Sequence, residues 1–131
     1  MNRLAQRYER HPHRQQGLTA ISIIVIIAMI GFFAMIAIRL FPIYMEHFSV
    51  KSHLKGLSEE VDIKSKTNGE ILDKLNKRFD IDDVKHVKND NIFIERQKDG
   101  SMTIAIEYEV RTPAIANVDM VVSFVDEVVL N

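Results

Sequence analysis

The pattern of hydrophobic residues changes along the chain from a continuous block, to a helical spacing, to a strict alternation. The block runs from Leu18 to Ile38, 21 residues without a charged side chain. A helix rises by about 1.5 Å per residue, so the block would span roughly 31 Å, close to the thickness of a bilayer's hydrocarbon core. A cleaved secretory signal has a shorter apolar region with small residues at the cut. The block therefore predicts a retained transmembrane helix over residues 18–41.

Helical spacing continues after the block. Pro42 fits the first turn of a new or kinked helix, and Ile43, Val50, Leu54 and Leu57 then fall on one stripe of that helix. These positions predict a helical stalk that continues the membrane helix.

A second helix is predicted beyond a charged, weakly patterned connector at residues 58–66. Thr67 and Glu70 have the spacing of a capping box, in which each residue satisfies a backbone N–H at the start of a helix. The apolar face of this helix would consist of Ile71, Leu72, Leu75 and Phe79, and the helix would end near Asp80.

Apolar and polar residues alternate in the last third, which predicts strands with one buried face. The expected buried sets are Met102, Ile104, Ile106, Tyr108 and Val110 in one strand, and Val118, Met120, Val122, Phe124, Val128 and Leu130 in the next. Asp126 interrupts the second set, which suggests a bulge or a strand end near it. Pro113 and Asn117 are expected to bracket the turn between the two strands.

A shorter strand over residues 91–97 is predicted to form a hairpin with the first long strand. A three-residue loop with Gly100 in the left-handed conformation would pair Ile94 with Ile104. A two-residue loop would instead set Glu95 against Ile104, and a slip of one residue moves the apolar set to the wrong face. The three-residue loop is therefore preferred.

The expected fold is α+β: an N-terminal transmembrane helix that continues into a helical stalk, and a second helix packed on a three- to four-stranded antiparallel sheet. Residues 84–87 would supply the fourth strand. The expected organisation is a basic tail at residues 1–17, the membrane helix at 18–41 and an α+β domain at 42–131.

Charge predicts the orientation of the chain in the membrane. The net charge is −1, which does not suggest a nucleic-acid partner, but the tail before the block carries Arg3, Arg7, Arg10 and Arg14 against Glu9 alone. Basic flanks remain in the cytoplasm, so residues 42–131 are expected on the opposite side. The chain has no cysteine, which excludes disulfides and thiolate metal sites.

The sequence contains no nucleophile elbow, no phosphate-binding loop and no convincing pair of catalytic carboxylates. Asp80, Asp82 and Asp83 form the densest acidic cluster, yet the residues that follow do not continue a calcium loop. The cluster is interpreted as a helix end and turn, in which Asp82 or Asp83 accepts backbone hydrogen bonds. His47 and His53 are six residues apart and do not share a helix face as a zinc pair would. The chain is therefore expected to be a non-enzyme without a metal, a cofactor or a small-molecule substrate.

Two groups of residues are candidate interaction sites. Glu107, Glu109 and Arg111 point away from the predicted buried face and form an exposed stripe. Gly31 and Ala34 belong to a ridge of small residues every third position in the block, which allows close approach of a second membrane helix. Each group also has an interpretation without a partner. The stripe can be an ordinary solvent-exposed strand face, and the ridge can reflect the ordinary frequency of small residues in membrane helices.

Four segments together resemble a small proteobacterial family of unknown function: QQGLT, FPIYMEHFSVK, RFDIDDVKHV and EYEVRTPAIANV. The resemblance covers nearly the whole chain. It implies a single-pass protein of the bacterial inner membrane with a periplasmic α+β domain, of a kind commonly encoded beside signal peptidase I and ribonuclease III. The family has no established activity or catalytic residues, so the resemblance implies a topology rather than a chemistry.

The start of the block has a weaker resemblance to the processing site of type IV pilins. A peptidase that cuts after the glycine would separate Gly17 from Leu18. The fifth residue after the cut is normally glutamate, whereas this chain has Ser22, so the docking carboxylate is missing. The other interpretation of Gly17 is a loop glycine before a membrane helix.

Two functions therefore remain as hypotheses. The first is an anchored periplasmic module that binds or regulates an envelope protein, with a link to secretion or protein processing implied by the family's gene neighbourhood. The second is a pilin-like structural subunit. The expected partners are the lipid bilayer and either an envelope protein or a second copy bound through the transmembrane helix.

Overall fold

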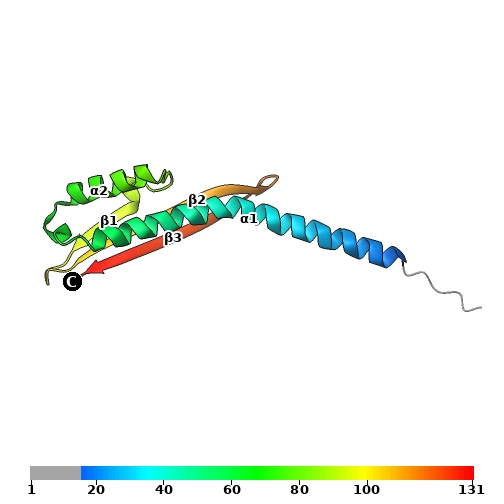
Figure 1. Ribbon diagram of the computed structural model, residues 1–131, viewed down its shortest axis with the longest axis horizontal. Coiled ribbons are helices and arrows are strands. Elements are labelled where there is room, and N and C mark those ends of the chain that lie inside the picture. The colour runs from blue at the N-terminus through cyan, green and yellow to red at the C-terminus, as the bar shows by residue number, and fades with distance from the viewer. Residues whose placement is uncertain (1–15) are drawn as a thin grey trace, which may run out of the picture. The chain divides into compact units, whose positions relative to one another are not determined.

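The computed structural model describes residues 16–131, which form two long helices, two short 3-10 helices and an antiparallel sheet (Figure 1). In chain order these are α1 (Gln16–Ser58), η1 (Ile63–Ser65), α2 (Asn68–Ile81), η2 (Asn89–Asn91), β1 (Ile92–Arg96), β2 (Met102–Ile115) and β3 (Val118–Leu130). The strand order is β1-β2-β3. The α+β fold expected from the sequence is confirmed. The tail arginines at positions 3, 7, 10 and 14 lie outside the described residues.

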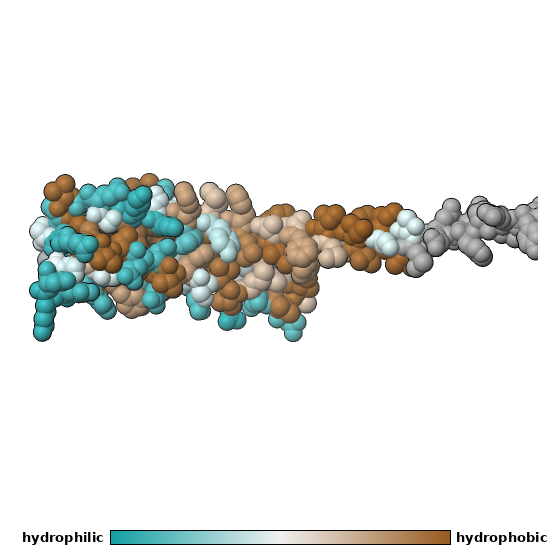
Figure 2. All heavy atoms as spheres, turned by 90° about the horizontal axis from the view of Figure 1, so that it is seen from below, coloured by the Kyte–Doolittle hydropathy of each residue, from teal (hydrophilic) through white to brown (hydrophobic). Residues whose placement is uncertain are grey.

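The chain divides into two compact units, one that ends at Met35 and one that comprises Ile36–Asn131. Within the described residues, the segment Thr19–Ser58 of α1 is long and apolar enough to cross a membrane, and no residue of its most apolar stretch is buried. Figure 2 shows hydrophobic side chains gathered along this helix beside the grey atoms. Pro42 lies inside α1, so no separate helix begins at the proline.

The second unit encloses one hydrophobic core between two helices and the inner face of the sheet. Val50, Leu54 and Leu57 of α1 are almost fully buried, as the stripe expected from the sequence requires. The other members of this core are Ile43, Ile63, Ile71, Leu75, Phe79, Val87, Ile92, Met102, Ile104, Ile106, Tyr108, Val110 and Phe124. The burial of one such aliphatic side chain contributes about 1.5–3 kcal/mol to stability. The core therefore holds the C-terminal part of α1 against the sheet.

The expected hairpin register is confirmed. Ile94 pairs with Ile104 and Ile92 pairs with Ile106, and Gly100 has a φ of 89°. A side chain at Gly100 would be strained because this φ lies in the left-handed region.

Three expectations about the sheet are wrong. Asp126 pairs with Ile106 in regular register, and the irregularity between β2 and β3 lies instead between Pro113 and Ile115. Pro113 belongs to β2, so the turn is shorter than expected and consists of residues 116–117. Val118, expected on the buried face of the last strand, is 60% exposed because it lies at the turn end of the hairpin. Residues 84–87 form no strand, so the sheet has three strands in the described part of the chain, the smaller of the two expected numbers.

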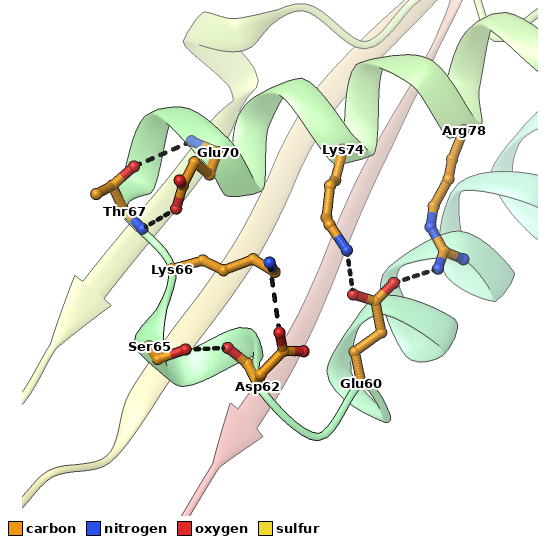
Figure 3. A network of polar contacts seen from close by, with 8 residues as sticks. All are labelled: Glu60, Asp62, Ser65, Lys66, Thr67, Glu70, Lys74 and Arg78. Carbon is orange, nitrogen blue, oxygen red and sulfur yellow. Dashed lines mark hydrogen bonds and ion pairs between the residues drawn. The ribbon is translucent and has the colours of Figure 1, made fainter.

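A polar network fixes the start of α2 and the connector before it (Figure 3). The capping box is confirmed, because Thr67 and Glu70 each accept a hydrogen bond from the other's backbone N–H. The carboxylate of Glu60 accepts hydrogen bonds from Lys74 and Arg78 of α2, each at 2.6 Å. The hydrogen bond from Lys74 is the largest cause that lowers the pKa of Glu60 below its ordinary 4.5. The connector is thus clamped to α2 by a carboxylate.

This clamp should make stability depend on pH. A carboxyl group whose pKa is lowered by folding stabilises the fold above its unfolded pKa, and that contribution disappears as the pH falls through the folded pKa. We expect Glu60→Gln to be less stable than the native chain at pH 7, with a difference that shrinks progressively below pH 4.5. Urea unfolding at a series of pH values measures this difference. Asp73→Asn, in the exposed pair of Asp73 with Lys77, is the control and should change little at any pH. A Glu60→Gln difference that is independent of pH would contradict the assignment.

Candidate interaction surface

The outer face of the sheet carries the exposed stripe expected from the sequence. Glu107, Glu109 and Arg111 of β2 are all exposed, and they alternate with residues of the buried core. Glu109 accepts a hydrogen bond from Ser123 at 3.2 Å, and Arg111 lies 3.7 Å from Asp119. The stripe is therefore continued by polar residues of β3.

The neighbouring strands add apolar groups that the sequence-based site did not include. Phe93 lies opposite Ala105, and Val125 lies opposite Glu107. Both Phe93 and Val125 are exposed, at 48% and 66% of their surfaces. A shallow hollow of about 300 Å³ lies among Phe93, Glu95, Thr103, Ala105, Glu107 and Glu127. This face is thus partly apolar, rather than only a solvated charged stripe.

Acidic groups dominate the same face. The strand register places five carboxylates on it and one cation: Glu95, Glu107, Glu109, Asp119 and Glu127 against Arg111. Clustered charge of one sign attracts a partner of the opposite sign and speeds its association. We call this acidic and apolar face of β1, β2 and β3 the outer sheet face. The alternation of residues within β1 and β3 indicates that Phe93 and Val125 lie on the exposed face of their strands. The position of Val125 beside Glu107 follows only from the pairing of β3 with β2.

The small-residue ridge of α1 is open in the structure. A side chain at Gly31 would meet no atom within 4 Å, and Ala34 is exposed. Farther along α1, Ile38, Phe41 and Met45 are also exposed at helical spacing. The involvement of Gly31 and Ala34 in helix contacts stays a prediction.

Gly17 and Leu18, the residues that flank the pilin-like cut, both lie in α1. Gly17 is therefore a helical residue and not the loop glycine that the other interpretation expected.

A histidine and an aspartate connect α1 to the inner face of the sheet. His47 Nε2 lies 2.6 Å from a carboxylate oxygen of Asp126, and its ring stacks on Phe124 with centroids 4.1 Å apart. The same cluster contains Tyr108, whose hydroxyl is buried without a hydrogen-bond partner among the described residues. Burial raises the pKa of Tyr108, and the charges of Glu46 and Asp126 raise it further. This cluster explains why an acid stands among the apolar inner residues of β3.

Two further pairs connect α1 to the segment after α2. Glu46 accepts hydrogen bonds from the backbone N–H groups of Lys85 and His86, and lies 2.8 Å from the ring of His86. His53 lies 2.6 Å from Asp82. The backbone N–H groups of Lys85 and His86 are thus satisfied by Glu46 and not by Asp82 or Asp83, contrary to the expectation from the sequence.

A larger groove of about 560 Å³ lies between α1 and this turn. Its lining residues are Phe41, Pro42, Met45, Glu46, Ser49, Asp82, Asp83, Lys85 and His86. Glu46, Asp82 and His86 are occupied by the pairs above, and Asp83 lies 3.0 Å from Lys85. No group of three or more potential metal ligands occurs among residues 16–131. The groove therefore offers mainly shape and apolar surface.

Comparison with known proteins gives one match. A family model described as a domain of unknown function (DUF4845) matches residues 39–124. No curated protein matches the chain. No solved structure matches it either. The matched segment covers most of the second unit and begins where the uncharged block ends.

Proposed function

The chain belongs to the DUF4845 family, whose function is unknown, and on this premise we propose that it is a membrane-anchored module that binds another protein through its outer sheet face. α1 would be the anchor, because it is the described helix that is long and apolar enough to span a bilayer. The domain that follows would be held at the membrane surface. The proposal assigns the chain no catalytic step, cofactor or small-molecule substrate.

The composition of the outer sheet face is the observation that carries this proposal. The opposite face of each strand supplies residues that are buried in the core or packed against it, so the fold does not require Phe93, Val125 or the carboxylates around them. A face that combines exposed apolar groups with charge of one sign is typical of a protein-binding surface. The complementary partner would present basic side chains around an apolar centre.

The compartment is part of the proposal. The basic tail before the uncharged block supports a cytoplasmic N-terminus and a domain on the opposite side. The resemblance to proteobacterial proteins encoded beside signal peptidase I supports the bacterial inner membrane and the periplasm, and it makes an envelope protein of secretion or protein processing the preferred partner. A second copy bound through Gly31 and Ala34 is a further contact that the same anchor would allow.

A photo-activated crosslinking residue at Val125 tests the proposed surface in membranes. We expect a discrete crosslinked product from Val125 and none from the same probe at Val61, an exposed residue of the connector. Glu107→Lys should abolish the product by reversing a charge beside Val125. High salt should weaken it, because the screening length falls from about 10 Å at 0.1 M to about 3 Å at 1 M.

The matched control is Glu59→Lys, an equal change of charge in the exposed connector. It should leave the Val125 product intact. Gly31→Leu distinguishes a partner bound to the outer sheet face from a second copy bound through α1. This substitution would remove contact between copies of α1 and leave the outer sheet face unchanged. If Val125 yields no product, or if Glu59→Lys removes the product as well as Glu107→Lys does, the outer sheet face is not the binding surface.

A further inference from the structure

The two loops of the sheet have opposite chemical character. The β1–β2 loop contains Lys98, Asp99 and Gly100, the composition of an ordinary solvated turn. The β2–β3 end reads Thr-Pro-Ala-Ile-Ala-Asn-Val over residues 112–118, without one charge. Figure 1 shows these loops at opposite ends of the sheet. One loop is therefore charged and the other is uncharged and mostly apolar.

The apolar loop is attached to α1 next to the end of the uncharged block. Arg39 is the first charged residue after that block, and its guanidinium donates a hydrogen bond to the carbonyl of Pro113. An arginine at the end of a membrane helix extends its charge toward the lipid headgroups. On the proposal that α1 spans the membrane, the contact places Pro113 at the level of the headgroups.

The hairpin continues beyond Pro113 and away from His47. His47 contacts Asp126, which lies opposite Ile106, whereas Arg39 contacts Pro113. β2 thus runs toward lower residue numbers of α1 as it approaches the turn. Ile115 lies two residues past Pro113, which adds about 7 Å of strand at about 3.3 Å per residue. The end of the hairpin therefore extends past the Arg39 guanidinium, on the side away from the contact of His47 with Asp126.

The side chains at this end are exposed and apolar. Ile115 and Val118 form the last pair of the hairpin, and 47% and 60% of their surfaces are exposed. Ala116, in the turn itself, has a φ of 50°, a conformation that usually selects glycine, asparagine or aspartate. The chain thus has an apolar residue where the backbone favours a polar one or glycine.

From these observations we infer that the β2–β3 turn, residues 113–118, is a second membrane-contacting element that inserts Ile115 and Val118 into the phospholipid surface. This inference rests on the proposed membrane anchor. Two large exposed side chains are too few for a stable protein interface, which buries about 800 Å² per partner. Lipid requires no such area and is already present at the level of Arg39. The contact would hold the domain at one height and orientation on the bilayer.

The full chain contains no tryptophan, so single tryptophan substitutions report on defined positions. Ile115→Trp and Val118→Trp probe the turn, and Val129→Trp, half exposed at the other end of β3, is the control. Phe32→Trp reports on the anchor. Each variant is placed in phosphatidylcholine–phosphatidylglycerol nanodiscs, with or without lipids brominated near the headgroup or deep in the acyl chains.

We expect headgroup-proximal bromine to quench both turn variants several-fold more strongly than Val129→Trp, and their emission to shift to shorter wavelength. Two turn positions keep the test valid if one substitution disturbs the fold. If Phe32→Trp is quenched but both turn variants behave like Val129→Trp, the inference is wrong. A shift to shorter wavelength without quenching by lipid means that protein covers the turn, which also overturns it. If Phe32→Trp is not quenched either, the membrane anchor and the lipid contact are overturned together.

Discussion

Replacement of Ile104 by alanine is expected to lower the free energy of unfolding by about 2–5 kcal/mol, the usual cost of a buried isoleucine truncated to alanine. Ile104 has no exposed surface and lies at the centre of the sheet, opposite Ile94 on one side and Val128 on the other. The lost methyl and methylene groups would leave a cavity that these fixed strands cannot close. Urea unfolding of the full chain in detergent micelles measures the change, with tyrosine fluorescence as the signal, because Tyr108 lies in the same core.

Val129→Ala is the matched control for Ile104→Ala. Val129 is an aliphatic residue of the same sheet, but it lies on the outer face with 54% of its surface exposed. Substitutions at such positions usually change stability by no more than about 0.5 kcal/mol. Equal losses in the two variants would mean that Ile104 is not enclosed between the sheet and the helices.

The elements that were predictable from the sequence are those specified by local rules. Strict alternation identified the buried face of β2, and the requirement that this face stay together selected the register in which Ile94 lies opposite Ile104. The spacing of Thr67 and Glu70 identified the start of α2. Each of these features depends on residues close together in the chain or on one turn.

The features that were mispredicted depend on contacts between distant residues. In the turn after α2, Asp82 or Asp83 was expected to accept the backbone hydrogen bonds. Glu46, which precedes Lys85 by 39 residues, accepts those of Lys85 and His86 instead. Asp126 was expected to disturb β3, because nothing near it in the sequence indicates that His47 lies opposite it. A polar residue on an apolar face is costly only when it lacks a partner, and here the partner is in α1.

The candidate site was predictable in part for the same reason. Glu107, Glu109 and Arg111 alternate with core residues of a single strand, so the pattern of β2 alone identified them. Phe93 and Val125 belong to neighbouring strands, and their place in the site depends on the pairing of all three. Exposed residues are not constrained by packing, so the sequence of one strand does not indicate which exposed residues of the other strands lie beside it.

Asp126→Ala is expected to destabilise the domain by about 1 kcal/mol, toward the low end of the cost of leaving a polar partner unsatisfied, because His47 is only partly buried. The side chains of Asp126 and His47 are only 11% and 23% exposed, and the stack of His47 on Phe124 holds the imidazole in place. If Asp126 were the strand irregularity that its position suggested, its loss would instead be neutral or stabilising. Urea unfolding of the full chain in detergent micelles distinguishes these results.

The neighbouring acid provides the control, because Glu127 is one residue away but points from the outer sheet face. Glu127→Ala should change stability by no more than about 0.5 kcal/mol. A double-mutant cycle with His47→Ala then isolates the pair, since residues in direct contact show coupling of about 0.5–3 kcal/mol. A coupling near zero, or equal effects at Asp126 and Glu127, would show that the contact between His47 and Asp126 does not hold α1 to the sheet. A large coupling would mean that the residue least consistent with the strand pattern is one of those that hold the C-terminal part of α1 to the sheet.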